Sequence, residues 1–342
     1  MQLETAKQAV IKAFSALASD EELEIDFHGG EPLLAFDLIR ELCEWIWSRK
    51  WPAPYICFAT TNGTLVAGGI KEWFQQNSEH FWLGLSLDGT REMHNLNRSE
   101  SFDQIDANFF RSQWPSQPVK MTVSDKTLPF LAEGVEYLQR SGFGFSWNLA
   151  YGIDWSERRN LKEFVRQLRK LVDFYLEHPQ FEVADPLAMG MEALSISKSA
   201  PQKWCGSGTH MRAVDIDGRE YPCHMFLPIT TAQSTGNIDW HCESTFIDTQ
   251  CAACPILPMC PTCYGKNFIE RGNIASRDQG LCDMFKVQAL ACTYLKASQL
   301  SRITKAPESI ESASKMLKEI DKIRRIQDDL TEDFVSRGIN LN

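Results

Sequence analysis

The sequence predicts an α/β protein in which a parallel sheet is covered by helices and is followed by a small cysteine-rich region and C-terminal helices. Its first half alternates short apolar runs with segments whose apolar residues recur at helical spacing. From about Ala200 this periodicity fades, and Cys, Pro and Gly become frequent. The β-α-β-α rhythm calls for a parallel sheet that is either open or closed into a barrel.

The predicted strands are short apolar runs that end in turn residues: Leu23–Phe27, Tyr55–Ala59, Phe81–Leu87, Val119–Val123 and Phe145–Leu149. The predicted helices each carry an apolar stripe: Thr5–Leu17, Phe36–Trp47, Gly69–Gln76, Leu128–Arg140 and Leu161–Glu177. Two more helices are expected after the cysteines, Met284–Leu300 and a last one following Pro307. This last helix either packs on the parent fold or serves a partner.

Small polar residues and glycines follow three successive predicted strands. The three loops contain Gly29-Gly30-Glu31-Pro32, Thr61-Asn62-Gly63 and Ser86-Leu87-Asp88-Gly89. Ligands of parallel α/β folds bind at the carboxyl ends of the strands. Ordinary turns use the same residue types, but three such loops at one edge of a sheet favour a ligand-binding rim.

The composition limits the kind of partner. The formal net charge is −10 and no long basic run occurs, which argues against nucleic acid and favours a small-molecule or peptide ligand. The first residues alternate polar and apolar positions like an amphipathic helix, unlike a signal peptide. The sequence contains no run of 18 apolar residues, so no membrane span is predicted. We therefore expect a cytoplasmic protein.

Most of the 11 cysteines crowd into one part of the chain: Cys205, Cys223, Cys242, Cys251, Cys254, Cys260, Cys263 and Cys282. In a reducing compartment such clusters indicate metal binding or catalysis. One zinc ion would leave several thiols unused, whereas iron–sulfur clusters use four cysteines and tolerate an open position. Spacing alone leaves iron–sulfur, zinc and inert thiols open. Cys43, Cys57 and Cys292 lie in apolar segments and are expected in the core.

The cysteine spacing resembles the SPASM domain of radical SAM peptide-modifying enzymes. The match consists of Cys205-x12-Gly218-x4-Cys223, then Cys251-x2-Cys254-x5-Cys260, and a closing Cys282. The resemblance implies two auxiliary 4Fe-4S clusters. Cys251, Cys254, Cys260 and Cys282 would hold one, and Cys205, Cys223 and Cys263 the other, with Cys242 or an open site as its fourth position. The chain departs at Cys260-Pro-Thr-Cys263, where two intervening residues replace three.

The first half resembles the radical SAM core, a partial (β/α)6 TIM-like barrel. The loop Gly29-Gly30-Glu31-Pro32 is similar to the family's GGEP motif, which binds the methionine amino group of S-adenosylmethionine (SAM). Asn62 lies in a T-N-G resembling that of the third strand. Ser86 and Asp88, with His94 and Arg98, resemble the S-x-D-G…H…R stretch. In that stretch the residues matching Ser86 and Arg98 contact the amino-acid end of SAM, as an arginine fork suits a carboxylate.

Two departures from the family narrow the prediction. The C-x3-C-x2-C that holds the SAM-cleaving cluster is absent from the sequence. We therefore expect an N-terminally truncated barrel without its first strand and cluster loop, an unpaired edge at Leu23–Phe27, and no SAM cleavage by the family's route. His224 stands where sulfatase-maturing members place an aspartate base. A neutral imidazole is a catalytic candidate or a structural residue, and this exchange argues against sulfatase maturation.

The resemblance implies a radical SAM core over 1–195, a SPASM domain over 200–300 and a helical tail over 301–342. It also implies a maturase that modifies a peptide or protein substrate by radical chemistry, with an electron donor such as flavodoxin or ferredoxin. Two alternatives stay open. One is a non-catalytic SPASM protein that binds a peptide or a partner, and the other is a zinc-stabilised binding module.

Overall fold

The computed structural model describes residues 1–18, 20–188, 203, 205–231, 238–302 and 310–341, and it divides into two compact units. The first unit comprises Met1–Thr122, Tyr137–Leu149 and Ser207–Ala232. The second comprises Val123–Glu136, Ala150–Gly206 and Gln233–Asn342. The boundary predicted between residues 195 and 200 lies outside the described residues, so the domain limits stay predictions.

Parallel strands form the centre of the first unit. β1 (Leu23–Phe27), β2 (Tyr55–Thr61) and β3 (Phe81–Leu85) are paired in the order β1-β2-β3, and both pairings are parallel. β4 (Val119–Val123) pairs with β5 (Phe145–Leu149), and a single parallel bridge joins Ser86 to Lys120. The predicted alternation of parallel strands and helices is confirmed. Within the described residues, however, no pairing closes the strands into a barrel.

β1 forms an edge of its sheet. It pairs only with β2 in the part of the chain that the structure describes, as the sequence predicts for an unpaired edge. Leu23, Ile25 and Phe27 are half-buried, and Glu24 and Asp26 between them are exposed. Charged side chains on one face of an edge strand disfavour pairing with another chain.

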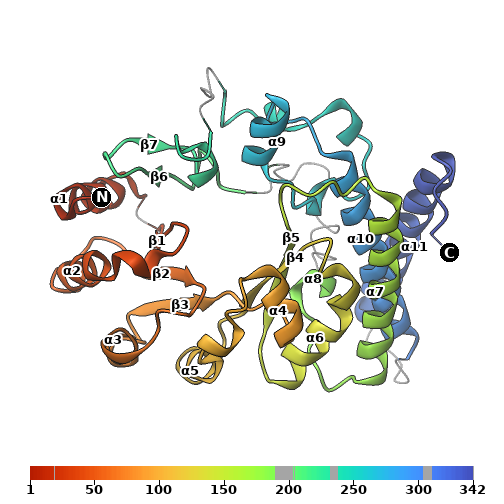
Figure 1. Cartoon of the computed structure of the whole chain (residues 1–342). Coiled ribbons are helices and arrows are strands. Elements are labelled where there is room, and N and C mark those ends of the chain that lie inside the picture. The colour runs from red at the N-terminus through yellow and green to blue at the C-terminus, as the bar shows by residue number, and fades with distance from the viewer. Residues whose placement is uncertain (19, 189–202, 204, 232–237, 303–309, 342) are drawn as a thin grey trace. The chain divides into compact units, whose positions relative to one another are not determined.

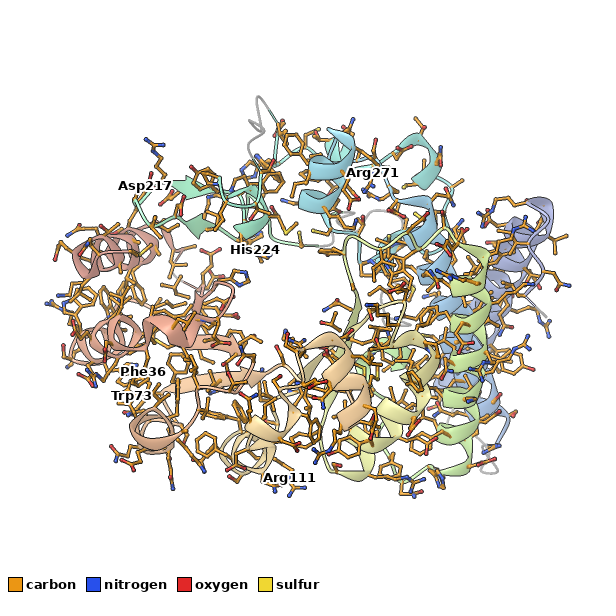
Figure 2. All side chains as sticks on the ribbon, in the orientation of Figure 1. Phe36, Trp73, Arg111, Asp217, His224 and Arg271 are labelled. Carbon is orange, nitrogen blue, oxygen red and sulfur yellow. The ribbon has the colours of Figure 1, made fainter. Side chains whose placement is uncertain are left out.

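Three helices of the first unit lie along one side of the three-stranded sheet (Figure 1): α1 (Leu3–Ala16), α2 (Phe36–Trp47) and α3 (Gly68–Gln76). Two short helices, α4 (Arg91–Asn97) and α5 (Ala107–Gln113), follow β3 in the chain. Aromatic rings fill the space between helices and strands. Phe36 and Trp73 (Figure 2) meet edge to face at 5.4 Å, and Phe74 packs against Phe81 at 5.1 Å. α4 and α5 were not predicted, because each is too short to show a helical period.

A small hairpin after residue 207 belongs to the first unit. Its antiparallel strands are β6 (Ala213–Val214) and β7 (Glu220–Tyr221), and the 3-10 turn η5 (His224–Phe226) follows. It rests on α1 through the Lys12–Glu220 ion pair, at 2.9 Å. Gly218 turns the hairpin at φ +86°, and a Cβ there would lie 3.1 Å from Thr5 Cγ2. The glycine of the SPASM-like spacing is thus the residue that this turn requires.

Helices form the second unit: α7 (Arg158–Glu177), α8 (Asp185–Ala188), α9 (Tyr264–Arg271), α10 (Gln279–Ser301) and α11 (Ile310–Ser336). α10 packs against both α7 and α11 (Figure 1). α11 buries Ile323, Ile326, Leu330 and Phe334, which confirms that it packs on the parent fold. α6 (Leu131–Arg140) has residues in both units. No helix of the described chain combines the length and apolar character that crossing a bilayer requires.

Candidate functional site

Four thiols of the second unit line one cavity. They are Cys251, Cys254, Cys260 and Cys282, and Ile256, Leu257, Arg277 and Lys286 complete the lining. These are the four cysteines that the resemblance to SPASM domains groups as the ligands of one cluster. The structure therefore brings together residues that are up to 31 positions apart in the chain.

Short turns carry three of these thiols. Cys251 ends the 3-10 turn η7 (Thr249–Cys251), which Asp248 caps by accepting a hydrogen bond from the Gln250 amide at 3.0 Å. The Cys254 amide then donates to the Cys251 carbonyl at 2.9 Å. A second 3-10 turn, η8 (Leu257–Met259), leads to Cys260. Successive turns without a regular helix let closely spaced thiols face one space.

The fourth thiol is in the first turn of α10. Asp278 caps this helix, and its carboxylate accepts a hydrogen bond from the Leu281 amide at 3.0 Å. Gly280 allows the helix to approach a neighbouring loop, because a Cβ there would lie 2.4 Å from the Ser156 nitrogen. The N-terminal end of a helix favours negative charge, so this position suits the Cys282 thiolate.

Two of the thiols in the cavity, Cys260 and Cys282, have raised pKa values. Burial, reinforced by the charges of Cys251 and Cys254, raises the pKa of Cys260 to about 11, and Arg277 opposes this rise. Burial, with Cys260 and its neighbours, raises the pKa of Cys282 to about 12, and Lys286 opposes it. Metal binding must therefore release protons from these thiols.

The donor set fits a group larger than one ion. A single zinc has Zn–S bonds of about 2.3 Å, so its four sulfurs lie within roughly 4 Å of one another. In the described part of the chain, no three His, Cys, Asp or Glu side chains gather closely enough to hold one metal ion. The four thiols instead surround a cavity. Thiols on the walls of a cavity, with two cations beside them, suit an iron–sulfur cluster.

The second predicted group of thiols is divided between the two units. Cys223 is buried in the first unit, and Cys205 and Cys263 belong to the second. Cys263 precedes α9, and its Sγ accepts a hydrogen bond from the Lys266 amide at 3.4 Å. Cys242 is exposed and contacts the Ser244 hydroxyl at 3.1 Å. Their role as one set of ligands stays a prediction.

In the first unit, Glu31 joins two of the predicted ligand-binding loops. Its carboxylate accepts hydrogen bonds from the Thr61 hydroxyl and the Asn62 amide, both at 2.8 Å. Pro32 begins the turn η1 (Pro32–Ala35), whose first two residues are buried, and nothing lies within 4 Å of a Cβ built on Gly29 or Gly30. The Glu31 oxygens are thus used within the protein, and the backbone around Gly29 and Gly30 is open.

Asp88 organises the third loop. It is fully buried and accepts hydrogen bonds from Arg98 Nε at 2.7 Å, Arg98 Nη2 at 3.0 Å and the Thr122 amide at 2.8 Å. Ser86 donates its amide to the Thr61 carbonyl at 2.9 Å. Two nitrogens of Arg98 therefore pair with Asp88 in this structure, and its contact with a SAM carboxylate stays a prediction.

His224 stacks on a histidine that the sequence did not single out. The ring of His28, next to the end of β1, is 4.2 Å from that of His224, and Asp26 Oδ2 is 3.7 Å from His28 Nδ1. Neighbouring protein atoms partly desolvate His224, and with the charge of His28 they lower its pKa, while Asp26 opposes this. The segment after β7 thus places the His224 ring (Figure 2) against His28, the residue that follows β1.

Sequence reasoning missed the two cations at the thiol cavity, Arg277 and Lys286. Lys286 comes four residues after Cys282 on α10, so the i,i+4 rule could have placed the two side chains on one face. Arg277 precedes the helix in an irregular segment, where no periodicity applies. His28 directly precedes the GGEP-like loop, which is the one signal that could have identified it.

Comparison with known proteins gives a distant relationship. No family model matches the chain. Three of the curated relatives are named Cysteine-type anaerobic sulfatase-maturating enzyme. One from Clostridium perfringens is 25% identical over 223 residues, 59% of this chain and 59% of the relative. The one from Clostridium novyi is 23% identical over 323 residues, 84% of each. The chain thus spans about three fifths of the length of the first of these relatives.

Solved structures show the same fold. Native anSMEcpe with bound AdoMet superposes with a TM-score of 0.65 at 20% identity, over 89% of this chain and 90% of that one. The complex of the same protein with AdoMet and the Cp18Cys peptide gives a TM-score of 0.63 at 20% identity, over 88% and 92%. The chain is therefore a distant relative of radical SAM/SPASM maturases. In particular, it is similar to the anaerobic sulfatase-maturating enzymes in fold across about nine tenths of its length.

Proposed function

We propose that this chain is of the radical SAM/SPASM maturase type but does not cleave SAM by the family's route, because it contains no C-x3-C-x2-C. In this proposal Cys251, Cys254, Cys260 and Cys282 hold an auxiliary 4Fe-4S cluster. The observation that carries the proposal is the convergence of these four thiols on one cavity. A bound cluster would supply an electron acceptor or a ligand for substrate. A second cluster at Cys205, Cys223 and Cys263, with Cys242 or an open site as its fourth position, completes the proposal.

We also propose that SAM binds at the carboxyl ends of β1, β2 and β3. The support is the contact between loops: Glu31 links the GGEP-like loop to Asn62, and Ser86 bonds to the Thr61 carbonyl. Because the Glu31 carboxylate is occupied, the carbonyl groups around Gly29 and Gly30 are the acceptors left for an ammonium group. A solved structure of similar fold holds bound AdoMet, which supports SAM as the ligand proposed here.

The proposed substrate is a peptide or protein segment, delivered in a cytoplasmic setting with electrons from a flavodoxin or ferredoxin. Solved structures of similar fold hold the Cp18Cys and Kp18Cys peptides. We assign His224 as the residue that accepts a proton from substrate, supported by its place near the end of β1 and its lowered pKa. A histidine in place of the aspartate that the resemblance predicts favours a substrate other than a sulfatase.

Metal analysis tests the cluster assignment. The chain is purified and reconstituted anaerobically with iron and sulfide, and iron, sulfide and zinc are measured. We expect about eight irons per chain for two clusters. Cys282→Ala should lose about four of them. Cys292→Ala is the matched control, because Cys292 is buried on the same helix and does not line the cavity. Stoichiometric zinc that excludes iron would instead support the zinc-stabilised module.

SAM binding and cleavage distinguish a radical SAM/SPASM maturase from a non-catalytic SPASM protein. The sequence contains no C-x3-C-x2-C, so we expect the 342-residue chain to bind SAM without forming 5′-deoxyadenosine under strong reductant. Calorimetry with SAM and chromatography of the products measure the two properties. Formation of 5′-deoxyadenosine would rule out the non-catalytic SPASM protein, and the absence of SAM binding would favour it.

A further inference from the structure

Resting on the proposed cluster, we propose that Arg277 and Lys286 are positioning residues that raise the reduction potential of the group held by the four thiols. Arg277 does so as a hydrogen-bond donor to sulfur and as a cation, and Lys286 as a cation alone. The two residues line the same cavity as Cys251, Cys254, Cys260 and Cys282. Neither Arg277 nor Lys286 belongs to the predicted ligand set.

Arg277 has one donor without a partner. Its Nη2 donates to the Phe246 carbonyl at 2.7 Å, and its Nη1 donates to the Ala275 carbonyl at 3.0 Å. The Nε atom is buried, and no acceptor for it is found among the described residues. A buried N–H group without an acceptor is unfavourable. A sulfur of a bound cluster would satisfy it, which is why the vacant donor points to an occupant of this cavity.

Among the described residues no carboxylate pairs with Arg277, and its guanidinium lies 5.4 Å over the Tyr264 ring. In the described part of the chain, the acceptors that hold its guanidinium are main-chain carbonyls, from Phe246, Ile274 and Ala275. A carbonyl fixes the side chain but does not cancel its charge. The full positive charge therefore acts on the thiols, and Cys260 is one of the groups that it affects.

Lys286 is held at the cavity by α11. Its Nζ pairs with Asp333 Oδ2 at 2.9 Å, and Arg337 bridges Asp333 and Asp283, both at 2.8 Å. The network contains two carboxylates and two cations, so it is close to neutral. Lys286 should therefore act more weakly than Arg277. The C-terminal helix fixes this lysine within the wall of the cavity, as its 13% side-chain exposure shows.

Charge explains the direction of the effect. Reduction adds one negative charge to a cluster that four thiolates already make anionic. Nearby cations and N–H donors stabilise the reduced form more than the oxidised form, and net charge and hydrogen bonds to sulfur are known determinants of cluster potentials. In a partly buried site such charges are weakly screened. Removing the cation must therefore lower the reduction potential.

The test is a reduction titration of the reconstituted full chain, followed by electron paramagnetic resonance. The Cys282→Ala variant identifies which signal belongs to this site. We expect Arg277→Gln to shift the reduction equilibrium at least tenfold toward the oxidised form, which is 59 mV for one electron. Arg277→Lys keeps the charge without Nε and should shift it less, and Lys286→Met should also give a smaller shift than Arg277→Gln.

Lys296→Met is the matched control. Lys296 is on the same helix and also pairs with α11, through Glu319 at 3.4 Å, but it does not line the cavity. Its potential should equal that of the wild type. If Arg277→Gln fails to fold or to load, the Arg277→Lys and Lys286→Met variants decide the question. If the reduction potentials of these variants equal that of Lys296→Met, the role of Arg277 and Lys286 is overturned, whereas the cluster assignment stands. If the Cys282→Ala variant keeps every paramagnetic signal of the wild type, the cluster assignment itself is overturned.

Discussion

Gly280 is the residue whose replacement should show most directly how the thiol cavity is built. It is buried in the first turn of α10, two residues before Cys282. A Cβ at this position would lie 2.4 Å from the Ser156 nitrogen and 2.6 Å from the Trp155 carbonyl carbon. Both are backbone atoms, so neither can rotate away. We expect Gly280→Ala to push α10 away from the loop by roughly 1 Å, because the new Cβ would be about that much closer to the backbone than an ordinary van der Waals contact allows.

Two effects of this substitution oppose each other. Alanine is favoured over glycine inside a helix by about 1 kcal/mol. Overpacking costs typically 1–3 kcal/mol, and a backbone clash belongs at the upper end of that range. The clash should win, which leaves a net destabilisation of about 2 kcal/mol. Because the displaced turn carries Cys282, the variant should also retain less iron.

Urea unfolding under anaerobic conditions, with hydrogen exchange of the α10 amides, measures this loss. Gly69→Ala is the control, since Gly69 is also helical and nothing lies within 4 Å of its Cβ position. It should be neutral or stabilising by up to about 1 kcal/mol. Equal or greater stability of Gly280→Ala would refute the close approach of α10 to the loop at Ser156.

Three further predictions concern the loops of the first unit. Glu31→Gln replaces one acceptor oxygen with a donor, so the Asn62 amide should exchange hydrogen faster and stability should fall by about 1–3 kcal/mol; unchanged exchange would contradict the contact. Asp88→Ala leaves the Arg98 charge without its buried partner and should cost about 3–5 kcal/mol in unfolding free energy, measured in urea; a loss below 1 kcal/mol would show that the pair is not structural. Burial lowers the pKa of His94 from 6.5 to about 4. Between pH 6.5 and pH 4, His94 is protonated in the unfolded chain but not in the folded chain. The free energy of unfolding should therefore fall by about 3 kcal/mol as the pH drops from 6.5 to 4. His94→Asn should remove that part of the pH dependence, and identical slopes for variant and wild type would exclude His94 as its source.

The strands and long helices could be predicted because their burial patterns are regular. β1, β2 and β3 were expected within two residues of their observed ends, and α2 with its observed bounds. α10 begins five residues before the predicted Met284, because its start is set by the Asp278 cap and the apolar period begins only later. The hairpin β6–β7 was missed, since strands of two residues carry no period.

The thiol site was predictable for a different reason. Spacing as short as Cys251-x2-Cys254 forces two thiols together whatever the fold, and Cys282 was added by resemblance. The structure agrees for all four thiols of this set. What spacing cannot give is the environment. Arg277 reaches the cavity from an irregular segment, and Lys286 is fixed there by Asp333, which is 47 residues away. Such partners depend on tertiary packing.

This difference between ligands and environment bears on how the chain could work. Four thiols define what the cavity can hold, but burial alone would oppose the charge that they need to bind it, as the raised pKa of Cys260 and Cys282 shows. The cations that offset this cost come from outside the motif, and one of them depends on α11. The C-terminal helix is therefore part of the electrostatics of the site and not only a packing element. A SPASM-like spacing without an equivalent of Lys286 and Arg277 would have the ligands of the cluster but a different reduction potential.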